Sequence, residues 1–406
     1  MAPSTFEDDF QAAVENKVIP GAVLVATNTS GTLNYAKAFG STGVSPDAQP
    51  LTLDSTFWLA SCTKLMATVA ALQCVERGLF SLDSPEDVAR LLPEFKTPDI
   101  VTSELAEHGR TTTKLHPAKN GITLRQLLTH TCGMANDFGN PALLAWRHSR
   151  GEEGCHFEVD ISKLQAPLVF EPGEGWDYST GLDWAGQMVE RANGGILLET
   201  YMQENVWGPL GMRSTTFHLE RNESVRTRLA GLSERVPETG LLVPAPAIMA
   251  DPARDATGGA GAYASAPDYL QVLTSILRDD GTLLKSATVA EMFTQQLQTT
   301  TDAIPGSQDA WMDKLRSGNI SVGIDPTPAD ITWGIGGTLL LEDLDGRRQK
   351  GTLAWWGYPN LFWWIDRKAG VTGFYAGQVL PARDAKSMEL FARFEKEIYQ
   401  RAKALK

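Results

Sequence analysis

The stretch TFWLASCTKLMATVAALQCVER, residues 56–77, indicates how the chain is built. It begins with a short strand-like run and continues with helical periodicity from Cys62 to Arg77. Gly78 follows at the point where such a helix would stop. At the junction lies Ser61-Cys62-Thr63-Lys64, the only S-x-x-K in the chain. We therefore expect a strand that leads into a helix, with a serine at the helix start and a lysine one turn later.

This serine and lysine have the chemistry of an activated nucleophile. The positive end of the helix dipole favours negative charge developing on the Ser61 oxygen. Lys64 would project over the same face and could take or hold the serine proton, provided that it is desolvated or lies near other positive character. The alternative is an N-capping serine followed by a solvated lysine, because a bare S-x-x-K occurs by chance in a chain of 406 residues.

A second candidate is Tyr178-Ser179-Thr180, which follows a turn at 171–175 and precedes a helix expected from about Leu182. A tyrosine between a loop and a helix can reach across a cleft. As a phenolate, or as a proton relay with Lys64, Tyr178 would serve the Ser61 hydroxyl. The alternative is a tyrosine that only packs or lies on the surface.

The third element is a glycine-bearing strand near the end of the chain, Trp355-Trp356-Gly357-Tyr358. A backbone N–H from this strand and the N–H of Ser61 would together form an oxyanion hole. The glycine would let a substrate approach the backbone closely. Tryptophans recur here at 355, 356, 363 and 364, and they either fill the core or form a pocket wall. For substrate binding we expect Trp355, Trp356 and Gly357, together with Trp146 and Trp176.

Hydrophobic periodicity predicts strands at both ends of the chain and helices between them. We expect a helix at 6–16, a hairpin at 21–27 and 33–39, late strands at 337–341, 351–356, 361–365 and 371–379, and a last helix at 386–401. In the middle, helices are expected at 124–130, 182–192 and 197–206, whereas the polar stretches 99–120 and 219–257 are expected to be loops or excursions on this helical part.

This order of elements predicts an α/β fold of the α+β kind, in which one antiparallel sheet is assembled from both termini, flanked by helices, with a helical lobe inserted. We expect one catalytic domain over residues 1–406. Its sheet lobe would comprise 1–75 and 262–406, and its helical lobe 76–261. The sequence shows no fixed-period repeat and no flexible linker that would divide the chain.

Composition and charge exclude several classes of function. With 36 basic and 49 acidic residues the formal net charge is −13, which disfavours binding to nucleic acid or to an anionic membrane. No apolar run is long enough to cross a bilayer, and the acidic start differs from a secretory signal, so a cytoplasmic protein is expected. The pairs His130/Cys132 and Cys155/His156 lack the second half of a zinc site, so we expect no metal and no cofactor.

The three motifs resemble those of the class C serine β-lactamases, within the superfamily of β-lactamases and penicillin-binding proteins. The segments IPGAVLVA, GITLRQLLTHTCG and GGAGAYASAPDYL resemble its fungal branch, which includes an acyltransferase that attaches a side chain in statin biosynthesis. The resemblance covers roughly residues 10 to 400 and is weakest at 99–120 and 219–257. It implies that Ser61 is the acylated serine, that Lys64 is the lysine of the serine motif, that Tyr178 is the tyrosine base, and that Tyr358 supplies the second oxyanion N–H.

Two departures from the family pattern count against antibiotic hydrolysis. Thr180 replaces the asparagine that ends the tyrosine motif, and Trp355-Trp356-Gly357 replaces the K-T-G triplet whose lysine grips a β-lactam carboxylate. The residues predict that Ser61 takes an acyl group from an ester or thioester, and the resemblance implies that the acceptor is a hydroxyl of a secondary metabolite. We expect the donor to be a thioester on an acyl carrier domain or coenzyme A, because thioesters are good donors inside cells. The alternatives are a carboxylesterase, in which water is the acceptor, and a catalytically silent scaffold that binds small molecules.

Overall fold

The computed structural model describes residues 5–105, 111–137, 140–154, 157–297 and 330–405. A seven-stranded antiparallel sheet, in the order β10-β11-β12-β13-β14-β1-β2, organises these residues. Its strands are β1 (Gly21–Asn28), β2 (Asn34–Gly40), β10 (Ile331–Trp333), β11 (Thr338–Leu340), β12 (Leu353–Gly357), β13 (Leu361–Asp366) and β14 (Val371–Ala376). Because β1 pairs with β14, the expectation that both ends of the chain build one sheet is confirmed.

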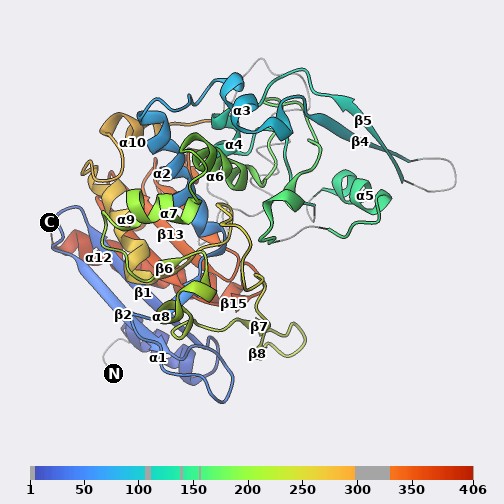
Figure 1. The fold of residues 1–406 in the computed structure, drawn as a ribbon. Helices are drawn as coiled ribbons and strands as arrows, with labels where there is room; N and C mark the ends of the chain where they lie inside the picture. The colour runs from blue at the N-terminus through green and yellow to red at the C-terminus, as the bar shows by residue number, and fades with distance from the viewer. Residues whose placement is uncertain (1–4, 106–110, 138–139, 155–156, 298–329, 406) are drawn as a thin grey trace.

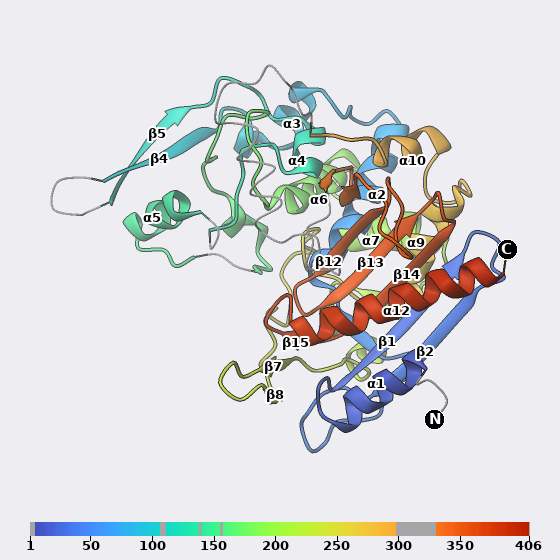
Figure 2. The same ribbon diagram turned by 180° about the vertical axis from the view of Figure 1, so that it is seen from behind.

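Both faces of this sheet are covered. Alternation along β1 sends Val23 and Val25 into one apolar core and Leu24 into another on the opposite face. Helix α9 (Ala266–Arg278) packs on β1, β13 and β14. On the other face, α12 (Ala385–Ala404) crosses the sheet beside α1 (Phe6–Glu15), as Figure 2 shows.

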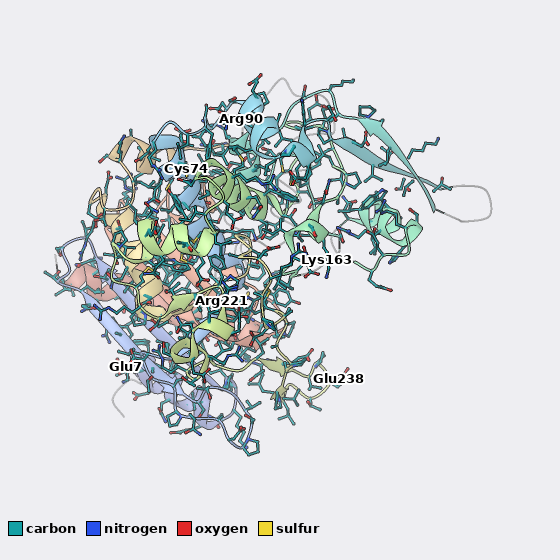
Figure 3. All side chains as sticks on the ribbon, viewed as in Figure 1. Glu7, Cys74, Arg90, Lys163, Arg221 and Glu238 are labelled. Carbon is teal, nitrogen blue, oxygen red and sulfur yellow. The ribbon has the colours of Figure 1, made fainter. Side chains whose placement is uncertain are left out.

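The helical part packs around α2 (Thr63–Glu76), which is buried along most of its length. Helix α6 (Gly181–Ala192) contacts α2, and α4 (Leu124–Thr129) contacts α6. The remaining helices here are α3 (Pro85–Leu91), α5 (Pro141–Ser149), α7 (Leu198–Met202) and α10 (Ser286–Met292). Figure 3 shows how side chains fill the space between these helices, with Cys74 of α2 among them.

Local signals explain where these helices begin and end. Thr123 caps α4, since its hydroxyl accepts from the Gln126 N–H while the Gln126 side chain accepts from the Thr123 N–H. After α2, Gly78 adopts a φ of +70° and donates its N–H to Val75 O, which ends the helix where the sequence predicted. The predicted helix at 197–206 divides into α7 and a π-helical turn, Gln203–Trp207.

The prediction of loops at 99–120 and 219–257 was wrong in part. The first stretch contains the hairpin β4 (Asp99–Leu105) and β5 (Thr111–Pro117), which projects from the body beside α5 (Figure 1). The second contains α8 (Glu223–Arg226), β7 (Ser233–Arg235) and β8 (Leu242–Pro244), and Figure 3 marks Glu238 between these two strands. Threonine-rich strands such as β5 are polar but have high β propensity. β7 pairs in parallel with the distant β15 (Val379–Leu380), which no local pattern reveals.

Two short strands tie the motif of Ser61 to a distant segment. β3 (Thr56–Trp58) pairs with β9 (Tyr263–Ser265), which also pairs with β6 (Thr215–Thr216). The segment just before Ser61 is thereby held beside residues 260–263, where Leu59 N–H donates to Ala262 O at 2.9 Å. Within the described ranges, no helix is both long enough and apolar enough to cross a membrane.

Candidate active site

Ser61 lies in a short turn between strand and helix. After β3, residues Ala60–Cys62 form a single 3₁₀ turn, and α2 begins at Thr63. Ala60 has a φ of +45°, a left-handed conformation that is strained for a residue with a side chain. The residue at the N-cap position of α2 is Cys62, and it makes no side-chain capping bond. The alternative of an N-capping serine is therefore wrong, and the helix starts slightly later than predicted.

Lys64 is buried, with 7% of its surface exposed. Its ammonium donates to Gly259 O at 2.8 Å and approaches Ser61 Oγ at 3.5 Å. The same nitrogen lies 4.7 Å from the centre of the Tyr178 ring. A solvated lysine, the alternative for the bare motif, is therefore wrong. The 3₁₀ turn before α2, the first turn of α2 and the loop before α6 bring Ser61, Lys64 and Tyr178 together.

The tyrosine loop is anchored on both sides of Tyr178. Asn136 donates its amide N–H to Tyr178 O at 2.8 Å, and the N–H of Ser179 donates to His130 Nδ1 at 3.1 Å. Trp355 donates its indole N–H to Tyr178 Oη at 3.1 Å, so the phenol oxygen is an acceptor in this arrangement. A donor of this kind favours negative charge on that oxygen.

His130 is a buried anchor of this loop. It ends α4 in a left-handed conformation with a φ of +63° and no exposed surface. Burial lowers the pKa of its imidazole well below the ordinary value, and the charge of Lys64 lowers it further. The ring is thus neutral and accepts the Ser179 N–H at Nδ1. This geometry agrees with the interpretation of His130 as a structural residue.

A largely apolar cavity of about 370 Å³ contains these groups. The sheet supplies Trp355, Trp356 and the following Tyr358, and the helical part supplies Trp176 and Tyr178. Phe157 closes one side, with its ring 4.9 Å from that of Tyr358. Of the residues predicted from the sequence, the cavity is lined by Ser61, Lys64, Trp176, Tyr178, Trp355, Trp356 and Tyr358.

Gly357 contributes by having no side chain. A Cβ at this position would lie 2.5 Å from Leu59 O and 3.3 Å from Cys62 Sγ. Only glycine therefore lets the end of β12 pack against the turn that carries Ser61. Tyr358 follows directly, which brings its backbone beside this turn.

Trp146 does not line this cavity, in contrast to the other tryptophans predicted for substrate binding. It lies on α5 and lines a separate hollow of about 840 Å³, where the Arg150 guanidinium lies 4.9 Å from its ring centre. Lys163, labelled in Figure 3, borders the same hollow. Sequence alone could not show which way this face of α5 points.

Asp183 is a residue of this cavity that the sequence analysis missed. It lies in the first turn of α6, is buried, and accepts the Gly259 N–H at 2.8 Å. Burial raises the pKa of its carboxyl above the ordinary value, and the charge of Lys64 opposes that rise. In the sequence, the short spacing between Tyr178 and Asp183 was only a weak sign that both lie at one site. The partner of Asp183, Gly259, is 76 residues away, and no local pattern links the two. Across the described ranges, His, Cys, Asp and Glu form no cluster of three or more that could hold a metal ion.

The sheet covered by helices, with serine, lysine and tyrosine meeting in one cavity, defines the class of β-lactamases and penicillin-binding proteins. A penicillin-binding-protein homologue from Pyrococcus abyssi shares this fold, with a TM-score of 0.66 at 18% identity over 95% of this chain and 76% of its own. Within the class, the chain belongs to the Beta-lactamase family, whose sequence profile matches residues 6–394.

Similar proteins are named as acyltransferases and esterases. Monacolin J acid methylbutanoyltransferase from Aspergillus terreus is 38% identical over 97% of this chain and 94% of its own. A lovastatin esterase from Penicillium rubens is 37% identical over 98% of each chain. A solved structure of a mutant simvastatin synthase from Aspergillus terreus superimposes with a TM-score of 0.88 at 36% identity, covering 98% of this chain and 97% of that one. The resemblance and the fold predicted from the sequence are thus confirmed.

Proposed function

We propose that this protein is an acyltransferase that forms an acyl-Ser61 intermediate and passes the acyl group to a hydroxyl of a small molecule. The observation that carries the proposal is the position of the Lys64 ammonium, 3.5 Å from Ser61 Oγ and 4.7 Å from the centre of the Tyr178 ring. A buried lysine and a tyrosine beside one serine form a proton-transfer unit for a nucleophile.

In the first half-reaction, Ser61 Oγ attacks the carbonyl carbon of the donor while its proton passes to Tyr178, assisted by Lys64. The carbonyl oxygen becomes an oxyanion, for which the backbone N–H groups of Ser61 and Tyr358 are the proposed donors. Collapse of the tetrahedral intermediate breaks the bond to the leaving alcohol or thiol, which takes the proton. The product is an ester of Ser61.

In the second half-reaction, an acceptor hydroxyl gives its proton to the same base and attacks the ester of Ser61. Collapse of this intermediate breaks the bond between the acyl carbon and Ser61 Oγ, which takes the proton back from the base as the new ester leaves. Trp355 and Trp356 favour an organic acceptor, because they form an apolar wall beside the serine. An acceptor that buries about 200 Å² of apolar surface would gain about 5 kcal/mol before its entropy cost. This gain would favour the acceptor over water.

The names of relatives support the substrate class. Two related proteins are named as methylbutanoyltransferases acting on monacolin J acid and on ML-236A carboxylate. For this chain we propose a hydroxyl of a polycyclic or similarly bulky secondary metabolite as acceptor. As donor we propose an acyl thioester on a carrier domain or on coenzyme A, and hence a cytoplasmic location, because such thioesters are made inside cells.

Ester hydrolysis is the second candidate function. It is favoured by the 37% identity to the protein named lovastatin esterase, which is similar over 98% of each chain. Both functions share the acyl-Ser61 step and differ only in the nucleophile of the second half-reaction. The binding scaffold is disfavoured by the buried lysine beside the serine, since burial of an ammonium is costly without a role.

A partition experiment separates these functions. The protein is incubated with a short-chain acyl thioester, with and without a panel of polycyclic alcohols, and ester and free acid are quantified. Transfer predicts ester at the expense of acid, whereas equal decay of acyl-Ser61 with every alcohol would establish hydrolysis. Labelling by a serine-reactive phosphonate, read by intact mass, tests the scaffold alternative. Ser61→Ala is the control and should abolish labelling and turnover while leaving the thermal transition nearly unchanged.

A further inference from the structure

A single residue, Gly259, connects Lys64 to a buried carboxylate through its backbone carbonyl and its backbone N–H. The Gly259 carbonyl accepts from Lys64 Nζ at 2.8 Å, and the Gly259 N–H donates to Asp183 Oδ1 at 2.8 Å. The carboxylate lies on α6, the ammonium on α2, and Gly259 in the turn before β9. Three segments far apart in the sequence thus meet at this point, directly behind Ser61.

The contact is close enough to exclude any side chain at the bridging position. A Cβ on Gly259 would lie 2.4 Å from Asp183 Oδ2, and a Cβ on the preceding Gly258 would lie 2.6 Å from Leu182 O. Glycine at both positions lets the turn approach the first turn of α6. The same turn is held on its other side by Trp58, whose indole N–H donates to Ala260 O at 2.7 Å.

We propose that Asp183 is a positioning residue for Lys64: through the backbone of Gly259 it fixes the ammonium beside Ser61, and its negative charge sets the pH range in which the serine is activated. This inference rests on the proposed roles of Ser61 and Lys64. It assigns no contact with substrate to Asp183.

Among the described groups whose pKa responds to the charge of Lys64, Asp183 is the carboxylic acid, and the others are His130 and Cys62. Tyr178 lies beside the ammonium, and Asp177 and Glu158 are further acids that line the same cavity. Burial keeps His130 uncharged by lowering its pKa, and it keeps Cys62 protonated by raising the pKa of the thiol. Burial raises the pKa of Asp183, and the charge of Lys64 acts against that rise.

The test is the pH profile of kcat/KM for a p-nitrophenyl ester with Asp183→Asn. The amide oxygen can still accept the Gly259 N–H, so this change removes the charge and keeps the bond. Loss of the negative charge disfavours the protonated form of the base. The ascending limb should therefore move to lower pH by about one unit. We expect kcat to fall while KM changes little.

Two further variants make the result decisive. Asp268→Asn is the matched control, because Asp268 is also a carboxylate with a burial-raised pKa that accepts a backbone N–H, from Ser214 at 2.6 Å, outside the cavity. It should leave the limb unmoved. Asp183→Ser, which retains a hydroxyl acceptor, should move the limb in the same direction and serves if the asparagine variant does not fold.

An unmoved limb in both Asp183 variants would overturn the inference, whether or not activity falls, because a purely structural carboxylate predicts that result. Phosphonate labelling of Ser61 in the parent protein keeps this outcome separate from the proposed function. If the parent is labelled and the limb does not move, only the role of Asp183 is wrong. If the parent is not labelled, the proposed function itself fails, and with it this inference.

Discussion

Replacement of Trp355 by phenylalanine tests whether the Tyr178 oxygen carries negative charge during the reaction. The indole N–H of Trp355 lies 3.1 Å from Tyr178 Oη, within the normal range for a hydrogen bond. Phenylalanine removes this donor and keeps an aromatic ring on the wall of the cavity. Because the donor favours the deprotonated oxygen, its loss should move the ascending limb of the pH–rate profile to higher pH.

The magnitude follows from the kind of bond that is lost. A hydrogen bond to a charged group contributes about 1.5–3 kcal/mol, and about 1.4 kcal/mol corresponds to tenfold. The limb should therefore move up by about one to two pH units, and kcat/KM below the limb should fall about 10- to 100-fold. Asp183→Asn is expected to move the same limb in the opposite direction, because it removes a negative charge that favours the protonated base. The two variants therefore test the same electrostatic explanation with shifts of opposite sign.

The assay is kcat/KM for p-nitrophenyl butanoate across the acid-to-alkaline range, with Trp333→Phe as matched control. Trp333 belongs to the same aromatic cluster, with its ring 4.7 Å from that of Trp355, but its indole N–H donates to Leu128 O. The control should leave the limb in place. If Trp355→Phe also leaves it in place, Tyr178 does not act through a charged oxygen, and the proposed base is wrong.

Three further predictions concern the base, the substrate and stability. Lys64→Ala and Tyr178→Phe should each lower the acylation rate by orders of magnitude. The double variant should lower it little further, because residues that act as one proton-transfer unit give non-additive losses. Additive losses would show that the two residues act independently. Nitrocefin turnover should be negligible, because Trp355 replaces the lysine that grips a β-lactam carboxylate in related enzymes, and hydrolysis at an ordinary enzymatic rate would contradict this. Burial holds the pKa of His130 well below 6.5, so below pH 6.5 the unfolded state takes up a proton that the folded state does not. This difference lowers the free energy of unfolding by about 1.4 kcal/mol for each pH unit below 6.5. Denaturant unfolding of His130→Gln should lack this part of the decline; an identical decline in parent and variant would show that His130 is not its source.

The sequence by itself determined those features that depend on neighbouring residues. Two runs of β-branched and apolar residues predicted the hairpin of β1 and β2, and helical periodicity with Gly78 predicted the extent of α2 within one residue at each end. The three-residue spacing of Ser61 and Lys64 places both on one turn, because side chains three positions apart lie on one helix face. The prediction that both termini share a sheet followed from the order of the elements alone.

The tertiary structure decided the features that depend on residues far apart in the chain. It placed Trp355 on Tyr178, a pair separated by 177 positions, and it placed Trp146 in another hollow. It also paired β7 with β15 and brought Gly259 between Asp183 and Lys64. Such contacts arise where separate layers pack, and local propensity does not encode which faces meet. The catalytic roles assigned to these residues stay predictions. The burial of Lys64 against the distant Gly259 carbonyl is the tertiary feature that distinguishes this S-x-x-K from a chance occurrence of the motif.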